Sequence, residues 1–425
     1  MAFLPFDDRK AIDQKATTMK TDLPQSNEPN PTRRLWIFLL IAILVFAGFY
    51  GAKLGWTFYR WDVGNWAYHY WAAPNPDPPV PDHEKHLIFV MVDHYEHGGP
   101  RDKERGAREN AIWCDKFMEI SENHRDDYGN KFRYTWFYPF DHQNGEIMER
   151  LSQMALGGFG EVELHWHLGS KSGVNRDNFQ DRLSEAIEWF QQYGALITDE
   201  NSETAFAYVA GVWDLDAGRG GQDTHGITNQ IQTLVEQGCY ADFTFSTIGT
   251  PAQPSTVNSL YYVTDDPDQP KSYDTGQPAR VGQSVDNQLL MFQGPSGLSW
   301  GGDLEYGAIE DDPRFEPDRV SKWIDANIHV HGRPEWIFVK VYSHGAQSQH
   351  VVLEHDLDWM LGSLKEQCRE RGIKLHFMTA REAFNVIKSA EAGKQGNPEQ
   401  YRDYQIGKYQ NMVKPFNQPA GNERP

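Results

Sequence analysis

Residues 87–99 read LIFVMVDHYEHGG, an apolar run that ends abruptly in ionisable side chains. Six apolar residues in a row are typical of a strand that is covered on both faces in a parallel sheet. Four ionisable residues follow the run: Asp93, His94, Glu96 and His97. In a parallel barrel the active site lies at the carboxyl ends of the strands, so this transition indicates a site. A solvated turn after the strand is the alternative interpretation.

Further apolar runs alternate with helical patterns between about residues 83 and 390. We expect strands at residues 87–92, 134–140, 161–168, 205–212, 240–245, 336–342 and 374–378. At least seven strands that alternate with helices favour an α/β fold, a distorted (β/α) barrel with about seven parallel strands. An open doubly wound sheet is the alternative. Residues 246–316 are rich in Pro, Gly and Asp and are too long for an ordinary connection, so we expect a functional loop or a small excursion there.

Residues 161–168 read EVELHWHL and alternate strictly between polar and apolar side chains. The apolar set is expected to pack against helices, and the polar set, Glu161, Glu163, His165 and His167, to face the interior. Two histidines spaced by two positions on a strand present their imidazoles side by side, which suits a divalent metal ion. A pair of hydrogen-bonded structural histidines explains the same spacing.

Ionisable residues also end three other expected strands. His344 follows WIFVKVYS and is a candidate metal ligand or general acid, with a structural histidine as the alternative. Asp214 follows Trp213 and is a candidate to orient a catalytic histidine, or else caps a helix. Asp141 and His142 follow a third strand, where a turn explains them equally well. Together these positions exceed what a purely structural barrel requires.

Residues 35–52 form an eighteen-residue stretch without a charge, LWIFLLIAILVFAGFYGA. As a helix this stretch is about 27 Å long, close to the apolar thickness of a bilayer, and we expect it to span a membrane. A buried core helix is the alternative. Arg33 and Arg34 before the span favour a cytoplasmic N-terminus, with the body of the protein periplasmic or otherwise extracytoplasmic. Four aromatic residues, Trp56, Phe58, Tyr59 and Trp61, are expected to form an interfacial belt.

The expected organisation therefore has five parts. They are a disordered tail at residues 1–34, the membrane anchor at 35–52, a juxtamembrane segment and Pro-rich linker at 53–82, the barrel at 83–390 and a polar tail at 391–425. The formal charge of −20, from 60 acidic and 40 basic residues, argues against a nucleic-acid partner. Three cysteines are too few for a disulfide scaffold.

Six segments in this order resemble the polysaccharide deacetylase superfamily, also called the chitooligosaccharide deacetylase homology family, and more closely an uncharacterised bacterial branch of it. The segments are VMVDHYE, TWFYPFDHQ, GFGEVELHWH, GCYADFTFST, NSLYYVTDDPDQPKSYDTG and WIFVKVYSHG. They lie within about residues 86–385. The common first motif has two consecutive acids, whereas this chain has Asp93 and His94. The common second motif spaces its histidines by three residues, whereas His165 and His167 are two positions apart.

The resemblance implies hydrolysis of acetyl groups on sugars with a divalent metal ion, most commonly zinc. By this resemblance Asp93, His94, His165 and His167 would hold the metal and its water, with Asp93 or Asp214 as the base. His344 would protonate the leaving group. Trp213, Trp300 and Tyr306 are candidates to stack on sugar rings.

We therefore expect a membrane-anchored deacetylase of an exported or cell-envelope polysaccharide, with polysaccharide biosynthesis or export proteins as possible partners. A catalytically inactive barrel that binds glycan or scaffolds an export complex is the alternative. A metal hydrolase of another ester, such as a phosphoester, is a third reading that the net charge disfavours.

Overall fold

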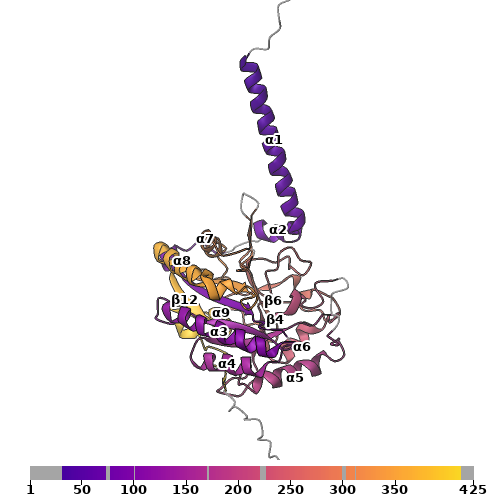
Figure 1. Cartoon of the computed structure of the whole chain (residues 1–425), viewed down its shortest axis with the longest axis vertical. Coiled ribbons are helices and arrows are strands. Elements are labelled where there is room, and N and C mark those ends of the chain that lie inside the picture. The colour runs from indigo at the N-terminus through magenta and orange to yellow at the C-terminus, as the bar shows by residue number, and fades with distance from the viewer. Residues whose placement is uncertain are drawn as a thin grey trace, which may run out of the picture. The chain divides into compact units, whose positions relative to one another are not determined.

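The computed structural model describes residues 31–72, 77–99, 101–169, 172–220, 226–298, 303–311 and 313–412. The chain divides into two units between Lys53 and Leu54. In the first unit the described residues belong to helix α1, Pro31–Arg60 (Figure 1), which continues into the second. The disordered tail expected at residues 1–34 lies outside the described residues up to residue 30, and Arg33 and Arg34 are helical.

Helix α1 is apolar along most of its length because it contains the expected span, residues 35–52. Within its segment Thr32–Arg60, an 18-residue window has a mean hydropathy of 2.4, and no residue of that window is buried. Among the described residues it is the one helix that is long and apolar enough to cross a membrane, by length and composition.

The expected linker at residues 53–82 contains more helix than we predicted. It holds the end of α1 and a second helix, α2 (Val63–Ala72), and it ends at a short 3-10 helix, η1 (Asp82–Glu84). Residues 73–76, part of the Pro-rich stretch, lie outside the described residues.

All seven expected strands are present in the second unit, and all are parallel to their neighbours. They are β1 (His86–His94), β2 (Tyr134–Pro139), β3 (Gly160–Trp166), β4 (Phe206–Ala210), β5 (Cys239–Asp242), β11 (Trp336–Ser343) and β12 (Lys374–Met378). The helices between them are α3 (Lys103–Asn123), α4 (Gly145–Leu156), α5 (Phe179–Gln191), α6 (Gln230–Glu236) and α8 (Asp356–Arg371). Helix α9 (Ala380–Glu391) follows β12 and begins with a capping box formed by Thr379 and Glu382.

The long segment at residues 246–316 adds strands to the same sheet. Strand β8 (Leu290–Gln293) pairs parallel with β5, and β6 (Ser259–Val263) lies antiparallel between β8 and β7 (Gly276–Pro278). Two short strands, β9 (Gly297–Leu298) and β10 (Leu304–Glu305), form a separate pair, and α7 (Asp318–Asp325) leads toward β11. The region is therefore an excursion that extends the sheet.

The sheet has the order β11-β1-β2-β3-β4-β5-β8-β6-β7, and β12 pairs with the first half of β1. Among the described residues the ladder of hydrogen bonds does not close, so the expected distorted barrel is not confirmed, and the fold is a mixed α/β fold with a large, mainly parallel sheet. The sheet is nevertheless strongly curved, because Phe292 of β8 packs against Phe338 of β11 with ring centroids 6.0 Å apart.

Alternate residues of the strands face two different cores. Leu87, Phe89 and Met91 of β1 pack in the larger cluster with residues of α3, α4, α5, α6 and α8. We call the face of the sheet that these helices cover the outer face (Figure 1). Ile88, Val90 and Val92 pack in a second cluster with the ends of β5, β8 and β11 and with α9, which we call the inner face. A strand that is apolar on both faces fits this burial on both sides.

The chain after residue 390, where we expected a polar tail, is folded as far as residue 412. The buried Arg402 pairs with Glu382 at 2.8 Å and with Glu399 at 2.7 Å. The hydroxyl of Tyr409 donates to Glu163 at 2.8 Å, on the inner face of β3. These polar residues are buried because each finds a charged or hydrogen-bonding partner, which composition alone does not reveal.

Candidate metal centre

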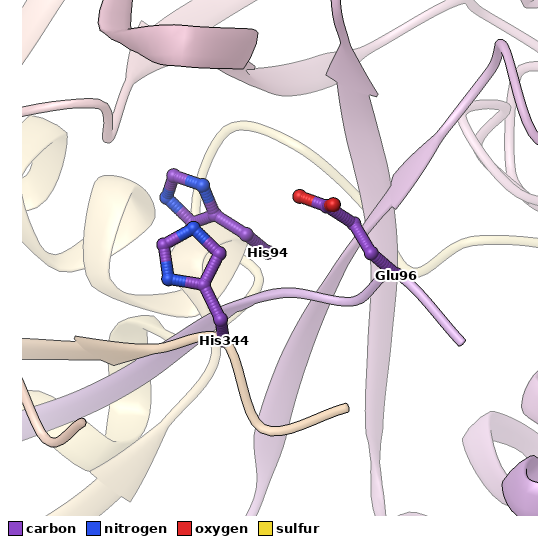
Figure 2. Close-up of side chains that lie close together, drawn as sticks. All are labelled: His94, Glu96 and His344. Carbon is purple, nitrogen blue, oxygen red and sulfur yellow. The ribbon is translucent and has the colours of Figure 1, made fainter. Parts of the chain in front are cut away.

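Five side chains from three strand ends meet on the inner face of the sheet. His94 ends β1 and Glu96 follows it, His165 lies in β3 and His167 follows it, and His344 comes directly after β11. We call these five residues the His–Glu group. Figure 2 shows the rings of His94 and His344 side by side, with the carboxylate of Glu96 directed toward them. Glu96 belongs to two groups of three potential ligands. One group contains His94 and His344, and the other, which we call the trio, contains His165 and His167.

Three donor atoms of the His–Glu group are spaced like the ligands of a small metal ion. Oε1 of Glu96 lies 3.2 Å from Nε2 of His165 and 3.3 Å from Nε2 of His167, and the two Nε2 atoms are 3.2 Å apart. Ligand atoms at about 2.0–2.1 Å from a tetrahedral zinc ion lie about 3.3–3.4 Å from one another. The donor set and its spacing therefore fit a divalent metal ion with nitrogen and oxygen ligands.

The far side of each imidazole is held by an acceptor. Nδ1 of His165 lies 2.9 Å from the carbonyl oxygen of Val209 on the neighbouring strand β4. Nδ1 of His167 lies 3.2 Å from the carboxylate of Asp141. When Nδ1 donates its proton to these oxygens, the lone pair of each Nε2 faces Glu96. Hydrogen bonds to the far nitrogen orient the imidazoles of metal-binding histidines in this way.

The protonation of the group follows from burial and from these contacts. Burial alone would raise the pKa of Glu96, but hydrogen bonds from His165 and His167 outweigh it and hold the pKa well below its usual range. Burial alone would lower the pKa of His167, but Asp141 and Glu96 raise it to about 10. Without a metal ion, His167 is therefore the cation between two carboxylates, a position that a bound metal ion would take over.

His94 and His344 form the other side of the group. Their ring centroids lie 4.5 Å apart, and His94 lies 4.9 Å from His165. Burial, with the neighbouring His344 and His165, lowers the pKa of His94 well below its usual value, so the ring is neutral and can donate a lone pair. Nδ1 of His344 lies 2.7 Å from Oε1 of Glu310, which outweighs burial and raises the pKa of His344.

Asp93, expected as a ligand or base, lies outside the potential metal-binding groups among the described residues. It follows the outer-face residues of β1, and its carboxylate accepts hydrogen bonds from Tyr134 at 2.7 Å and from Ser343 and the backbone of Gly345 at 3.0 Å. Burial raises its pKa to about 7. A Cβ atom at residue 345 would collide with this carboxylate. Asp93 thus ties the end of β1 to the end of β11.

The expected base Asp214 also lies outside the potential metal-binding groups among the described residues. It is buried and accepts a hydrogen bond from the backbone of Arg219 at 3.0 Å. Val212 and Trp213, just before it, have positive φ angles of 50° and 56°, an uncommon conformation for these residue types. This turn projects Val212 and Trp213 into two different cavities beside the group.

One cavity, of about 270 Å³, lies beside His344 and Glu310 and is lined by Trp213 and Tyr306. Two of the three expected sugar-stacking residues therefore share one cavity, and Trp300 lies outside the described residues. The indole N–H of Trp213 is buried and has no hydrogen-bond partner among the described residues.

A second cavity, of about 610 Å³, lies beside His167 and Asp141. Val212, Trp166, Arg182 and Arg219 contribute to its wall. Its volume is in the range of small-molecule binding sites. The His–Glu group thus has a cavity on either side.

Sequence reasoning did not single out Glu96 among the carboxylates after the first strand, and it did not find Glu310 as a partner of His344. Glu96 is one of the four ionisable residues that follow the first apolar run. It lies two positions after His94, and in an extended chain this spacing places both side chains on the same face. Glu310 lies 34 residues before His344 in the long excursion, and no local pattern relates the two. Asp141 was a candidate site residue in the sequence, and its contact with His167 shows that it lies beside the His–Glu group.

The fold and these residues define an α/β protein with a candidate metal centre at the carboxyl ends of parallel strands. No family model matches the chain, and no curated protein sequence matches it. Among solved structures it is similar to a putative glycoside hydrolase/deacetylase from Parabacteroides distasonis, at 12% identity and a TM-score of 0.38, with 71% of each chain covered.

It is also similar to a GH57-type branching enzyme from Pyrococcus horikoshii, at 11% identity and a TM-score of 0.35, with 74% of this chain and 71% of that chain covered. A GH57 branching enzyme from Thermococcus kodakaraensis matches at 13% identity and a TM-score of 0.30, with 74% and 72% covered.

Proposed function

We propose that this chain is a membrane-anchored, metal-dependent hydrolase that removes acetyl groups from an exported or cell-envelope polysaccharide. The observation that carries the proposal is the trio of Glu96, His165 and His167, whose three donor atoms lie 3.2–3.3 Å apart. A divalent ion, most commonly zinc in the family that the sequence resembles, supplies a Lewis acid that polarises an acyl carbonyl and acidifies water.

The residues around the trio have distinct roles in this proposal. Glu96, His165 and His167 would hold the ion, the His94 ring lies beside His165, and Asp141 and the carbonyl of Val209 orient the two imidazoles. His344 moves the proton: its Nδ1 is held by Glu310, so its Nε2 takes a proton from the attacking water and returns it to the departing amine or alkoxide. Glu310 stabilises the imidazolium formed between the two transfers.

The two cavities supply room for a glycan on either side of the reacting bond. Trp213 and Tyr306 offer aromatic surface to a sugar ring, and the indole N–H of Trp213 offers a donor to a hydroxyl. Asp93 acts as a positioning residue, because its hydrogen bond from Gly345 fixes the segment that carries His344.

Membrane attachment through α1 belongs to the same proposal. The apolar segment of α1 supports a single span, and Arg33 and Arg34 support a cytoplasmic N-terminus in the inner membrane, with the folded unit outside. An anchored enzyme of this kind would work beside proteins of polysaccharide biosynthesis or export.

The test is acetate release by the purified full chain in detergent, after metal removal by a chelator and reloading with zinc, manganese, cobalt or nickel. N-acetylated and O-acetylated oligosaccharides are the substrates. We expect activity in the reloaded protein and none in the His165→Ala/His167→Ala variant. A protein that carries metal and binds these glycans but releases no acetate would overturn the proposal in favour of a glycan-binding or scaffold role.

A further inference from the structure

Five large aromatic side chains are exposed where α1 ends and α2 begins. They are Trp56, Phe58, Tyr59, Tyr68 and Trp71, which we call the aromatic patch, and their exposed fractions range from 42% to 81%. Phe58 and Trp71 stack with ring centroids 6.3 Å apart, so the two helices present one continuous surface. All five residues belong to the second unit of the chain. Exposed aromatic surface of this extent usually marks an interaction site.

The opposite side of α2 is fixed to the folded unit. Val63 and Trp66 are fully buried in a small cluster with Ile248 and Val257. The side chain of Asn65 donates to the carbonyl of Gln253 at 2.9 Å. Helix α2 is therefore amphipathic and firmly seated, and the direction of its exposed aromatic side chains is set by packing.

The segment that holds α2 is also a wall of the smaller cavity. Thr247, Ile248 and Thr250 line the cavity beside His344. Trp61, in the turn between α1 and α2, packs against Tyr306 of the same cavity with ring centroids 6.2 Å apart. Whatever binds the aromatic patch therefore acts on a surface directly attached to the candidate site.

The aromatic patch follows the apolar stretch closely in the sequence, and this position indicates what the patch binds. Trp56, the first residue of the aromatic patch, lies four residues after Ala52, the end of the uncharged apolar stretch. Tryptophan and tyrosine next to an apolar span are the residue types of the membrane–water interface, and amphipathic helices with such residues lie in the plane of that interface.

We propose that the aromatic patch lies in the interfacial layer of the membrane that α1 enters, and that α2 thereby holds the cavity beside His344 at the membrane surface. The proposal extends the belt expected at residues 56–61 to Tyr68 and Trp71 of α2. Trp61 instead faces the folded unit. The inference rests on the membrane anchor proposed above and does not depend on hydrolase activity.

The native cysteines make a site-specific test possible, because Cys114, Cys239 and Cys368 are all free and buried. Tyr68→Cys in the full chain is labelled with an environment-sensitive NBD fluorophore and reconstituted into phosphatidylcholine–phosphatidylglycerol vesicles that contain a nitroxide lipid. Trp359→Cys, at an exposed aromatic residue on α8, is the matched control, and unmodified protein checks that the native cysteines do not react. Tyr59→Cys provides a second position in the aromatic patch.

We expect blue-shifted emission and several-fold stronger nitroxide quenching at residues 68 and 59 than at residue 359. Equal quenching at all three positions overturns the proposal. Blue-shifted emission that the nitroxide lipid does not quench would show a protein partner, such as a second copy of the chain, and also overturns it. Carbonate extraction of the unlabelled vesicles tests the anchor separately, since an extractable chain contradicts the anchor itself.

Discussion

The Nε2 atoms of His165 and His167 lie 3.2 Å apart, and both face Oε1 of Glu96. Two imidazole nitrogens at this distance cannot both carry a proton that points toward the other. One proton or one metal ion between them removes the conflict. The backbone carbonyl of Val209 and the carboxylate of Asp141 hold the opposite nitrogens, so the two Nε2 atoms are aimed at a common point.

The first prediction is that the full chain binds about one equivalent of a divalent metal ion, as a single site with one ligand set does. Elemental analysis after reconstitution should find this equivalent, and it should be absent from the His165→Ala/His167→Ala variant. His124→Ala is the matched control, because His124 is also a buried histidine paired with a carboxylate, Asp358 at 2.7 Å, outside the His–Glu group. Equal metal content in all three proteins would contradict the assignment of the ligands.

Asp93 and Glu96 should behave differently although they are three positions apart. Glu96→Gln should lose the metal, because it removes an anionic oxygen from the trio. Asp93→Asn should retain the metal but lower the free energy of unfolding by about 1–3 kcal/mol. The Asp93 carboxylate offers one oxygen to the buried donor of Tyr134 and the other to that of Gly345, whereas an asparagine amide has only one acceptor oxygen. Metal analysis and denaturant titration measure the two effects. Loss of metal in Asp93→Asn with unchanged stability would restore Asp93 as a ligand.

The positions of Asp93 and His94 show which features of the site the sequence could predict and which it could not. The strands were predictable because continuous apolar runs mark buried parallel strands, and the strict alternation of residues 161–168 placed His165 and His167 on one face. Residues 87–92 are apolar on both faces, so alternation there does not reveal which side Asp93 takes. Asp93 follows Leu87, Phe89 and Met91 outward, and His94 follows the inner set.

The remaining differences arise from contacts between distant parts of the chain. Strand β8 enters the sheet beside β5 from a segment rich in turns, and its short apolar run is hidden among Pro, Gly and Asp. Glu310 reaches His344 from the same excursion. Within the polar segment at residues 398–409, Arg402 and Tyr409 are buried because they find partners on α9 and β3. Pairings of this kind are set by the folded topology and leave no local pattern.

Asp141 should tune the site without being a ligand of the trio. Asp141→Asn removes the negative charge that holds Nδ1 of His167, at 3.2 Å, and should weaken metal binding by roughly 10- to 100-fold. Competition with a fluorescent chelator measures the dissociation constant. Asp115→Asn, which removes a carboxylate from an exposed pair with Arg150, is the control and should leave it unchanged. An Asp141→Asn protein with the affinity of the wild type would contradict the role of Asp141 in orienting His167.

A pH effect on stability is expected at the opposite end of β1. Burial, with the charge of His376 nearby, lowers the pKa of His86 from 6.5 to about 4. Between these values the unfolded chain binds a proton that the folded chain does not, so stability falls as the pH drops from 6.5 toward 4. His86→Gln should make the melting temperature less dependent on pH in this window than in the wild type. The exposed His83 provides the control, His83→Gln, which should keep the wild-type slope.

The last prediction concerns the glycan and the cavity beside His344. Trp213 lines this cavity, and its indole N–H is buried without a hydrogen-bond partner among the described residues. Loss of one aromatic contact of about 0.5–1.5 kcal/mol corresponds to a roughly 2- to 10-fold weaker affinity. Trp213→Ala should therefore raise KM for an acetylated oligosaccharide by this factor and change kcat less, because a stacking contact is made equally in the bound and transition states.

Trp359→Ala is the matched control for this substitution. Trp359 is a partly exposed tryptophan that packs on Phe315 and His355, and it is not part of the wall of either cavity beside the His–Glu group. Steady-state kinetics of both variants, with metal content checked in parallel, separate substrate binding from damage to the metal centre. If both variants raise KM equally, or if Trp213→Ala changes only kcat, the cavity beside His344 does not bind the sugar. The larger cavity beside His167 is then the next candidate for the sugar-binding site.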